Sequence, residues 1–278
     1  MNKWILGARP RTLPAAVTPV VVSVAIAYPV FNFINALLAL IVGLALQIAV
    51  NYANDYSDGI KGTDAERIGP TRLVASGLAS AAEVKQAAIA AFGIGAVAGL
   101  YFSIRTSYWL IAIGAAAMIA AWRYTGGKNP YGYRGLGEVY VFIFFGLVAT
   151  IGTYYGQTGQ VGIEVIMAAI SNGAVACALL AANNIRDIDG DTKVGKRTLA
   201  VRLGDTRARR FYMLLIFIAI FSSFTVTILA SLGIFWAIRL LKEIQFRKGK
   251  DLIEVLGATG KFQLILGGLI TIGTLVNI

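Results

Sequence analysis

Eight apolar segments run through almost the whole chain and leave little sequence between them. They cover approximately residues 13–30, 34–53, 87–104, 108–122, 137–156, 161–182, 211–238 and 262–276. Several reach the roughly 20 residues that a helix needs to cross a bilayer. Only 14% of the residues are charged, whereas soluble proteins carry about 25%. The sequence therefore predicts an all-α, multi-pass transmembrane helical bundle that forms one domain over residues 1–278.

The basic residues indicate how this bundle is oriented. All of the 25 Lys and Arg residues except Arg105 and Lys261 fall on one side of the predicted spans. By the positive-inside rule that side, which includes the N-terminus, is cytoplasmic. The net charge of +11 is then explained by topology. We therefore expect a lipid bilayer around the protein, and neither a nucleic acid nor another protein as its partner.

The segment 211–238 is short for the number of crossings that this topology requires. The basic residues before and after it belong on the same side, so the chain must cross an even number of times between them. Two full spans need about 40 residues, and the segment has 28. We expect two shortened helices that break near Ser231 or Gly233, or else one long tilted helix. The bundle then contains about nine helices, with eight as the alternative.

Two aspartate-rich stretches lie where apolar segments give way to polar sequence. The first is NYANDYSDGIKGTD, in which Asn51, Asn54, Asp55 and Asp58 follow the spacing i, i+3, i+4, i+7. In a helix these four side chains share one face within two turns. The first stretch therefore gathers carboxylate and amide groups on one side of a helix end.

The second stretch, NNIRDIDGDTKVGKR from residue 183, repeats this pattern. Asn184, Asp187 and Asp191 follow the spacing i, i+3, i+7, and an offset of 133 residues superposes them on three of the four residues above. A single acidic helix end is often only a solvated cap. Two matching clusters that face each other would repel without a cation between them. Asp64 and Asp189 lie off the pattern and are explained by capping or solvation.

The residue types narrow the choice of metal. Histidine is absent, which excludes imidazole zinc sites and Ser-His-Asp triads. Carboxylates are hard ligands for Mg²⁺ or Ca²⁺, and Mg²⁺ usually binds through one or two carboxylates together with substrate phosphates. The second stretch is not an EF-hand loop, because Thr192 stands where that loop needs glycine and no glutamate closes it. We expect a hard divalent cation, Mg²⁺ or Ca²⁺, between the two clusters.

Basic residues in the same loops point to a phosphate ligand. The candidates are Lys61, Arg72 in GPTRLVASG, Lys128 in YTGGK, and Lys193, Lys196 and Arg197 after the second stretch. Topology alone would place many cations here. Arg72 and Lys128, however, lie in short glycine-containing loops, where they are able to bind phosphate oxygens. Metal and cations together suit a diphosphate.

The tyrosines form a third set. Tyr52, Tyr56 and Tyr124 lie beside the candidate metal and phosphate groups, where a ring face is able to stabilise a carbocation. We interpret the others as interfacial or packing residues, which are common at membrane surfaces. They include Tyr131, Tyr133, Tyr140, Tyr154 and Tyr155.

A diphosphate held at the mouth of a lipid-embedded bundle implies that the other end of the substrate is apolar, as in a prenyl diphosphate. A CDP-alcohol phosphotransferase is disfavoured, because its DGxxAR pattern is not continued after Asp58 and Gly59. A transporter of cations or anionic solutes is a further alternative. Transporters place ionisable residues near the bilayer midplane, whereas here they cluster at helix ends.

With these motifs the chain resembles the intramembrane prenyltransferases of the UbiA superfamily over nearly its whole length. The NDxxD motif of that family corresponds to Asn54, Asp55 and Asp58, the DxxxD motif to Asp187 and Asp191, and the YxxxK element to Tyr124 and Lys128. RPRTLPAAVTPV from residue 9 and YTGGKNPYGYRGLGEVYVFIFFG from residue 124 are most similar to the branch that acts in menaquinone biosynthesis.

The resemblance implies a bundle around a central cavity open to lipid, in a bacterial plasma membrane. It also implies transfer of a polyprenyl group from polyprenyl diphosphate to 1,4-dihydroxy-2-naphthoate, with loss of carbon dioxide and pyrophosphate. The product is a demethylmenaquinol. Homogentisate and 4-hydroxybenzoate are alternative aromatic acceptors, and prenyl length depends on cavity depth.

The resemblance also assigns roles to residues. Mg²⁺ would be held by Asn54, Asp58, Asp187 and Asp191, and catalysis would involve Arg72, Tyr124 and Lys128. Substrate binding would involve Asn51, Asp55, Lys61, Arg72, Lys128, Asn184, Lys193 and Lys196.

Overall fold

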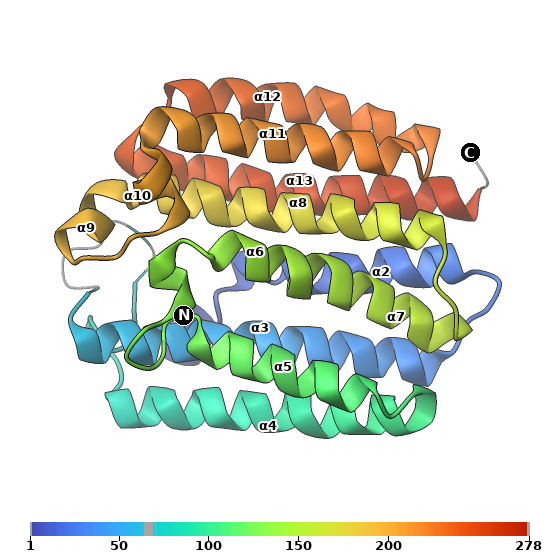
Figure 1. Ribbon diagram of the computed structural model, residues 1–278, viewed down its shortest axis with the longest axis horizontal. Helices are drawn as coiled ribbons and strands as arrows, with labels where there is room; N and C mark the ends of the chain where they lie inside the picture. The colour runs from blue at the N-terminus through green and yellow to red at the C-terminus, as the bar shows by residue number, and fades with distance from the viewer. Residues whose placement is uncertain (1, 64–68, 70, 277–278) are drawn as a thin grey trace.

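The computed structural model describes residues 2–63, 69 and 71–276 as a bundle of helices that run side by side (Figure 1). The long segments are α2 (Pro14–Ala27), α3 (Phe33–Lys61), α4 (Ala81–Thr106), α5 (Leu110–Arg123), α6 (Gly137–Val141) continued by π-helical η3 (Phe142–Val148) and α7 (Ala149–Thr158), α8 (Ile163–Arg186), α11 (Asp205–Phe224), α12 (Ile234–Phe246) and α13 (Leu252–Leu275). The short elements are α1 (Lys3–Ala8), η1 (Pro10–Thr12), η2 (Tyr131–Arg134), α9 (Ile188–Lys193), α10 (Leu199–Leu203), η4 (Ile228–Gly233) and η5 (Gly249–Asp251). The predicted all-α bundle of about nine helices is confirmed.

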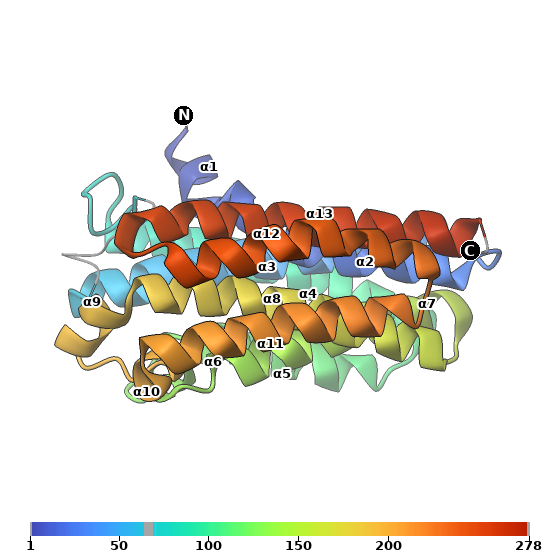
Figure 2. The same cartoon turned by 90° about the horizontal axis from the view of Figure 1, so that it is seen from above.

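Consecutive long segments run in opposite directions, so the loops gather at two ends of the bundle (Figures 1 and 2). One end holds the C-terminus of α3 together with α9 and α10, and the other holds the turn between α7 and α8. We call the first the motif end, because residues 51–62 and 183–198 lie there. Five helical segments in the described part of the chain are long and apolar enough to cross a membrane, and residues 3–12 and 14–27, bent by 51°, form a sixth if counted together.

The segment 211–238 forms two helices, which was the first of our two expectations. The break lies at residues 225–227, between α11 and the 3₁₀ turn η4 that leads into α12, and not near Ser231 or Gly233. α11 begins at Asp205 and α12 continues to Phe246. Both helices thus include basic residues from outside the apolar segment. The long aliphatic stems of these side chains can lie along the bundle while their charged groups stay in water. The apolar segment 211–238 is shorter than the two helices together, because both helices continue into charged sequence.

Helix α8 lies in the middle of the bundle and packs against α11, α13 and η3. Its closest neighbour is η3, where a Cβ atom added to Gly146 would lie 2.5 Å from Cα of Gly173 in α8. Glycines let two backbones approach to this extent. The single cysteine, Cys177, is buried in the same helix and is free, as expected. The central position of α8 fixes where the second aspartate stretch enters the motif end.

The loop after the first stretch is bounded by two strong helix signals. Helix α3 ends at Gly62, which adopts a left-handed conformation with φ of 68° that favours glycine. Helix α4 begins with a capping box in which the side chains of Ser80 and Glu83 each bind the other residue's backbone N–H. Arg72 lies between these two points in the sequence, and its side chain lies beside Asp58 of the first stretch.

Candidate active site

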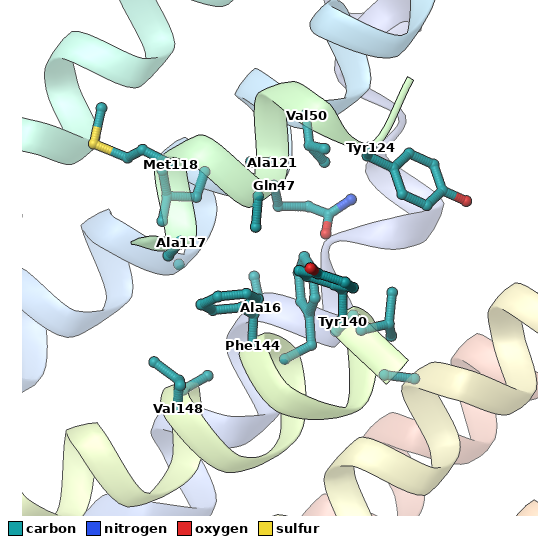
Figure 3. Close-up of a pocket in the computed structure, with 18 of the residues that line it drawn as sticks. Ala16, Gln47, Val50, Ala117, Met118, Ala121, Tyr124, Tyr140, Phe144 and Val148 are labelled. Atoms are coloured by element: carbon teal, nitrogen blue, oxygen red, sulfur yellow. The ribbon is translucent and has the colours of Figure 1, made fainter. Parts of the chain in front are cut away.

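A cavity of about 600 Å³ lies between the helices, and both aspartate stretches line it. Asp58, Asp187 and Asp191 contribute at the motif end. The rest of the wall is mainly apolar and comes from α2, α3, α4, α5 and η3; Figure 3 shows Val50, Met118, Phe144 and Val148 around this part. Leu100 and Ile111 also line the cavity and are 50% and 42% exposed. The surrounding helices therefore cover the apolar part of the cavity only in part.

Asp58 is a buried carboxylate of the cavity that contacts three side chains from other elements. It is 3% exposed, and its Oδ1 accepts a hydrogen bond of 2.5 Å from the hydroxyl of Tyr133. Its Oδ2 lies 3.3 Å from Nζ of Lys196 and 3.7 Å from Nη2 of Arg72. Lys196 also lies over the ring of Tyr133, 4.8 Å from its centroid. The first stretch thus presents a carboxylate that is already surrounded by two cations and a phenol.

Asp55 is fully buried and does not line the cavity. Its two oxygens accept hydrogen bonds from the backbone N–H groups of Leu73 at 2.8 Å and Val74 at 3.1 Å. Leu73 is itself fully buried. These contacts pin the loop that carries Arg72, whose side chain lines the cavity. Asp55 thus contacts the loop of Arg72 and does not border the cavity, and its expected part in substrate binding stays a prediction.

The two asparagines of the first stretch both line the cavity. Nδ2 of Asn51 donates to the carbonyl of Ala8 at 3.0 Å and to Oγ1 of Thr12 at 3.1 Å. Oδ1 of Asn54 accepts from the hydroxyl of Thr125 at 2.8 Å. Each amide is thus held by a different neighbouring element, which fixes its orientation at the cavity wall.

The second stretch is bent where the first is straight. Helix α8 ends at Arg186, and α9 begins after Asp187, so the spacing i, i+3, i+7 crosses a break in the helix. Asp187 forms a two-pronged ion pair with the adjacent Arg186, with both N–O distances at 2.7 Å. Asp191 lines the cavity, and its Oδ2 lies 3.5 Å from the hydroxyl of Thr198. Asn184 also lines the cavity and donates to Glu138.

The donor set at this end fits a hard divalent cation that arrives with phosphates. Among the described residues, no three acidic side chains come together as a ready-made metal cluster. Asp58 and Asp191 nevertheless line one cavity together with Asn54 and Asn184. Mg²⁺ usually takes one or two carboxylates and completes its shell with water and substrate phosphates, so a dense acidic cluster is not required.

Aromatic rings form a continuous row along one wall, which we call the aromatic row: Tyr124, Tyr131, Tyr140 and Phe144. Tyr124 and Tyr131 meet edge to face at 5.5 Å, and Tyr131 stacks on Tyr140 at 3.9 Å. Burial raises the pKa of Tyr124 and Tyr131 above the ordinary value, and the nearby Glu138 raises the pKa of Tyr124 further. Both phenols therefore stay neutral at physiological pH, and the row offers uncharged ring faces to the cavity.

Several residues expected at the site lie outside the cavity. Lys128 and Lys193 are exposed, because each follows the helix or turn that bears the motif and extends toward solvent. Nζ of Lys61 donates to the carbonyl groups of Thr125 and Gly127, at 2.6 and 3.1 Å.

Two of the tyrosines that we expected near a carbocation also lie elsewhere. Tyr52 donates to the carbonyl of Trp4, and Tyr56 packs on Trp122. Asp64 lies outside the described residues.

The arrangement agrees with what the sequence shares with known proteins. Residues 16–251 match the UbiA prenyltransferase family. The chain belongs to that family. This UbiA prenyltransferase is 45% identical, over 95% of its length and 93% of the relative's, to a protein of Mycobacterium tuberculosis named 1,4-dihydroxy-2-naphthoate octaprenyltransferase. An Escherichia coli protein of the same name is 39% identical, over 77% of this chain and 72% of its own. As a member of the family the protein is an integral membrane protein.

Solved structures show the same fold at low sequence identity. A UbiA homolog from Aeropyrum pernix K1 has a TM-score of 0.72 with 17% identity, over 94% of this chain and 97% of its own. A UbiA homolog from Archaeoglobus fulgidus, bound to GPP and Mg²⁺, has a TM-score of 0.70 with 14% identity, over 99% and 100%. The bundle of this UbiA prenyltransferase is therefore the fold of the family.

Sequence reasoning missed the residues that follow Tyr124 in this UbiA prenyltransferase. Tyr131, Tyr133 and Tyr140 were interpreted as interfacial, yet all three line the cavity, and Tyr133 binds Asp58. A signal was present, because Tyr131 and Tyr133 lie close together in a glycine-containing loop between two apolar segments. Such a loop folds back over the bundle end when a left-handed residue allows it, here Gly135 with φ of 71°.

Proposed function

We propose that this UbiA prenyltransferase transfers a polyprenyl group from polyprenyl diphosphate to 1,4-dihydroxy-2-naphthoate. The observation that carries the proposal is one cavity with two chemically different parts. Both aspartate stretches and two cations lie at the motif end, and a mainly apolar wall makes up the rest. An anionic head and a long apolar tail match this division. The names of the relatives support the naphthoate as acceptor.

The diphosphate binds at the motif end. Arg72 and Lys196 line the cavity there and provide positive charge for phosphate oxygens. We infer that Asn54, Asp58, Asp187 and Asp191 hold Mg²⁺, with Asp187 exchanging its contact with Arg186 for this role. When bound, Mg²⁺ neutralises charge on the leaving pyrophosphate. The bound GPP and Mg²⁺ of the archaeal homolog support a divalent cation at such a site.

The reaction joins two carbon atoms and releases two small products. The C–O bond of the prenyl diphosphate breaks, and pyrophosphate leaves with the bonding electrons. The ring carbon of the acceptor that bears the carboxylate forms the new C–C bond. The carboxylate then leaves as carbon dioxide, and its bonding pair restores the aromatic ring, so no net proton is gained or lost. The product is a demethylmenaquinol.

The chain's own contribution is to stabilise an allylic cation and to keep water away from it. The neutral rings of the aromatic row provide electron-rich faces along the cavity wall. The apolar wall beside them, including Phe144 and Val148, excludes water that would otherwise hydrolyse the cation. Arg72 and Lys196 stay beside the departing pyrophosphate and stabilise its charge.

We also infer that the motif end faces the cytoplasm of a bacterial cell and that the chain acts as one domain. The distribution of basic residues supports this orientation. Cys177 is buried, so a cysteine introduced at exposed Lys193 can be labelled selectively. A membrane-impermeant maleimide should label Lys193→Cys only in inverted vesicles, and Gln160→Cys, at the opposite end, only in intact cells. The reverse result would invert the topology.

The function is tested by prenyl transfer in nanodiscs. Radiolabelled polyprenyl diphosphate is offered with 1,4-dihydroxy-2-naphthoate, homogentisate or 4-hydroxybenzoate, in Mg²⁺ or in EDTA. We expect Mg²⁺-dependent product with the naphthoate and release of carbon dioxide. Product with another acceptor only would move the protein to a different quinone pathway. No product with any acceptor, from monodisperse protein, would contradict the proposal and favour a transport function.

A further inference from the structure

Glu138 is a buried acid that none of the motifs includes. It lies in the first turn of α6 and is 4% exposed. Its Oε1 accepts a hydrogen bond of 3.0 Å from Nδ2 of Asn184, and its backbone carbonyl accepts one of 3.0 Å from Sγ of Cys177. Cys177 and Asn184 are seven residues apart in α8, so they lie on the same face of that helix. Both the side chain and the backbone of Glu138 are thus attached to the face of α8 that leads to the second aspartate stretch.

This attachment is costly, which suggests that it serves the site. Oε2 of Glu138 has no hydrogen-bond partner in the described part of the chain. Burial of a carboxylate with so few donors is unfavourable, and such groups in native proteins call for an explanation. The only side-chain donor to Glu138 that the described residues provide is Asn184, which lines the cavity.

The hydrogen bond determines which way the amide of Asn184 is turned. A carboxylate oxygen accepts hydrogen bonds, so the atom of Asn184 beside it must be the NH₂ group. Oδ1 of Asn184 is therefore the atom that Glu138 does not hold. With an apolar residue in place of Glu138, nothing at this point would distinguish the two ends of the amide.

The equivalent asparagine of the first stretch also has its amide nitrogen bound by a neighbouring residue. Asn51 is related to Asn184 by the offset of 133 residues. Its NH₂ group donates to the carbonyl of Ala8, which can only accept, and to Oγ1 of Thr12. Both asparagines line the cavity, and the amide nitrogen of each donates a hydrogen bond to a neighbouring residue. The same orientation thus arises twice, from a backbone carbonyl in one half and from Glu138 in the other.

We propose that Glu138 is a positioning residue that holds Asn184 with its amide oxygen available to the substrate complex. The inference rests on the proposed function. An amide oxygen cannot bind a diphosphate oxygen directly, because both are acceptors. It binds a cation carried by the diphosphate, or a hydroxyl group of the aromatic acceptor. A residue that orients a ligand through a hydrogen bond in this way is worth about 10–100-fold in affinity or activity.

The experiment compares Glu138→Ala, Glu138→Gln, Asn184→Ala and the double variant Glu138→Ala/Asn184→Ala. Glu138→Gln retains an oxygen that accepts from Asn184 and removes only the charge. We expect kcat/KM of Glu138→Ala to fall roughly 10–100-fold, and that of Glu138→Gln to stay within about threefold of the parent. The double variant should be no worse than Asn184→Ala, because Glu138 acts through that residue. Glu164→Ala, at the exposed start of α8, is the matched control and should not change kcat/KM.

A binding measurement separates the two possible contacts. Thermal unfolding is followed with an unreactive prenyl thiolodiphosphate while Mg²⁺ is titrated. If Asn184 binds the cation, the Mg²⁺ concentration for half-maximal stabilisation rises in Glu138→Ala. If it binds the acceptor, that concentration is unchanged and KM for the naphthoate rises. Either shift supports the positioning role, and a Glu138→Ala variant in which neither quantity moves contradicts it.

Three kinetic results would also overturn the inference. Parental activity of Glu138→Ala would mean that the contact is only structural. Equal losses in Glu138→Ala and Glu138→Gln would mean that the charge itself is needed. Additive losses in the double variant would mean that Glu138 does not act through Asn184. If the parent protein transfers no prenyl group at all, the proposed function fails, while the Mg²⁺ titration still decides the role of Glu138.

Discussion

The two aspartate stretches match in sequence but differ in how the structure holds their carboxylates. In the first, Asp58 is bound by side chains from other elements, namely Tyr133, Arg72 and Lys196. In the second, Asp187 is bound by its own neighbour Arg186. The carboxylate of Asp58 is therefore held by residues from distant parts of the chain, whereas that of Asp187 is paired with the residue next to it.

The difference shows that a repeated motif need not form two equal halves of a site. The first stretch gathers the cations that suit a diphosphate, because loops from three parts of the chain converge on Asp58. The second neutralises one carboxylate locally and leaves Asp191, on the short helix α9, as its less enclosed acid. We infer that the first stretch receives the diphosphate and that the second completes the binding of the cation.

The largest effects should come from Asp58→Asn and Asp191→Asn. Each removes a negative charge from the candidate cation site, and we expect activity to fall by at least about 100-fold, the upper range for outer-shell residues. Prenyl transfer at saturating Mg²⁺ measures the loss, and size-exclusion chromatography checks that the variants are folded.

The same pair of variants tests whether the halves differ. Asp58→Asn removes the carboxylate beside Lys196, so the diphosphate should bind more tightly in EDTA than it does to the parent. Asp191→Asn should show a smaller gain, because it leaves the carboxylate of Asp58 in place beside Lys196. Equal binding by both variants would show that the halves are electrostatically alike.

A smaller but still large effect is expected for Asp55→Asn. The carboxylate binds two backbone N–H groups, and an amide has only one oxygen to offer them. One buried N–H then loses its partner, at a cost of about 1–3 kcal/mol. The loop shifts with Arg72, so KM for the diphosphate should rise while KM for the acceptor stays constant. An equal rise in both constants would show that the loop serves the whole cavity.

A moderate effect is expected for Tyr133→Phe, which retains the ring and removes the hydroxyl that binds Asp58. A hydrogen bond to a charged group is worth about 1.5–3 kcal/mol, so we expect roughly a tenfold loss of kcat/KM. The ring still supports Lys196 and Lys61. Tyr154→Phe, outside the cavity, is the matched control. If Tyr133→Phe is fully active, the orientation of Asp58 does not depend on the phenol.

The fold was predictable because each long element carries its own signal. The length of the apolar segments predicted the spans, and the positions of the basic residues predicted on which side of the membrane each loop lies. The pair α11 and α12 was harder, since apolar length undercounts a helix whose ends are charged. Its break at residues 225–227 has no glycine or proline to mark it, which explains why we expected it near Gly233.

The acidic residues of the site were predictable, and the residues that contact them were less so. Helical spacing predicted the position of Asp58 at the cavity, because Asp58 lies within one helix, α3. Asp187 and Asp191 also line the cavity as expected, although the helix breaks between α8 and α9. Tyr133 and Glu138 reach the site through the path of the loop before α6, which no local pattern encodes. Lys128 was expected at the cavity from its motif, and its exposure follows from the turn at Gly127, where φ is 81°.

The smallest effect should come from Asp189→Asn, although this residue lies between two acids of the second stretch. Asp189 is exposed on α9 and does not line the cavity. Surface substitutions of this kind usually change stability by no more than about 0.5 kcal/mol, so turnover and Mg²⁺ dependence should remain close to those of the parent. A loss as large as that of Asp191→Asn would mean that α9 rotates when the diphosphate binds. In that case the second stretch would be the mobile half of the site, and the first stretch would be the fixed half against which it closes.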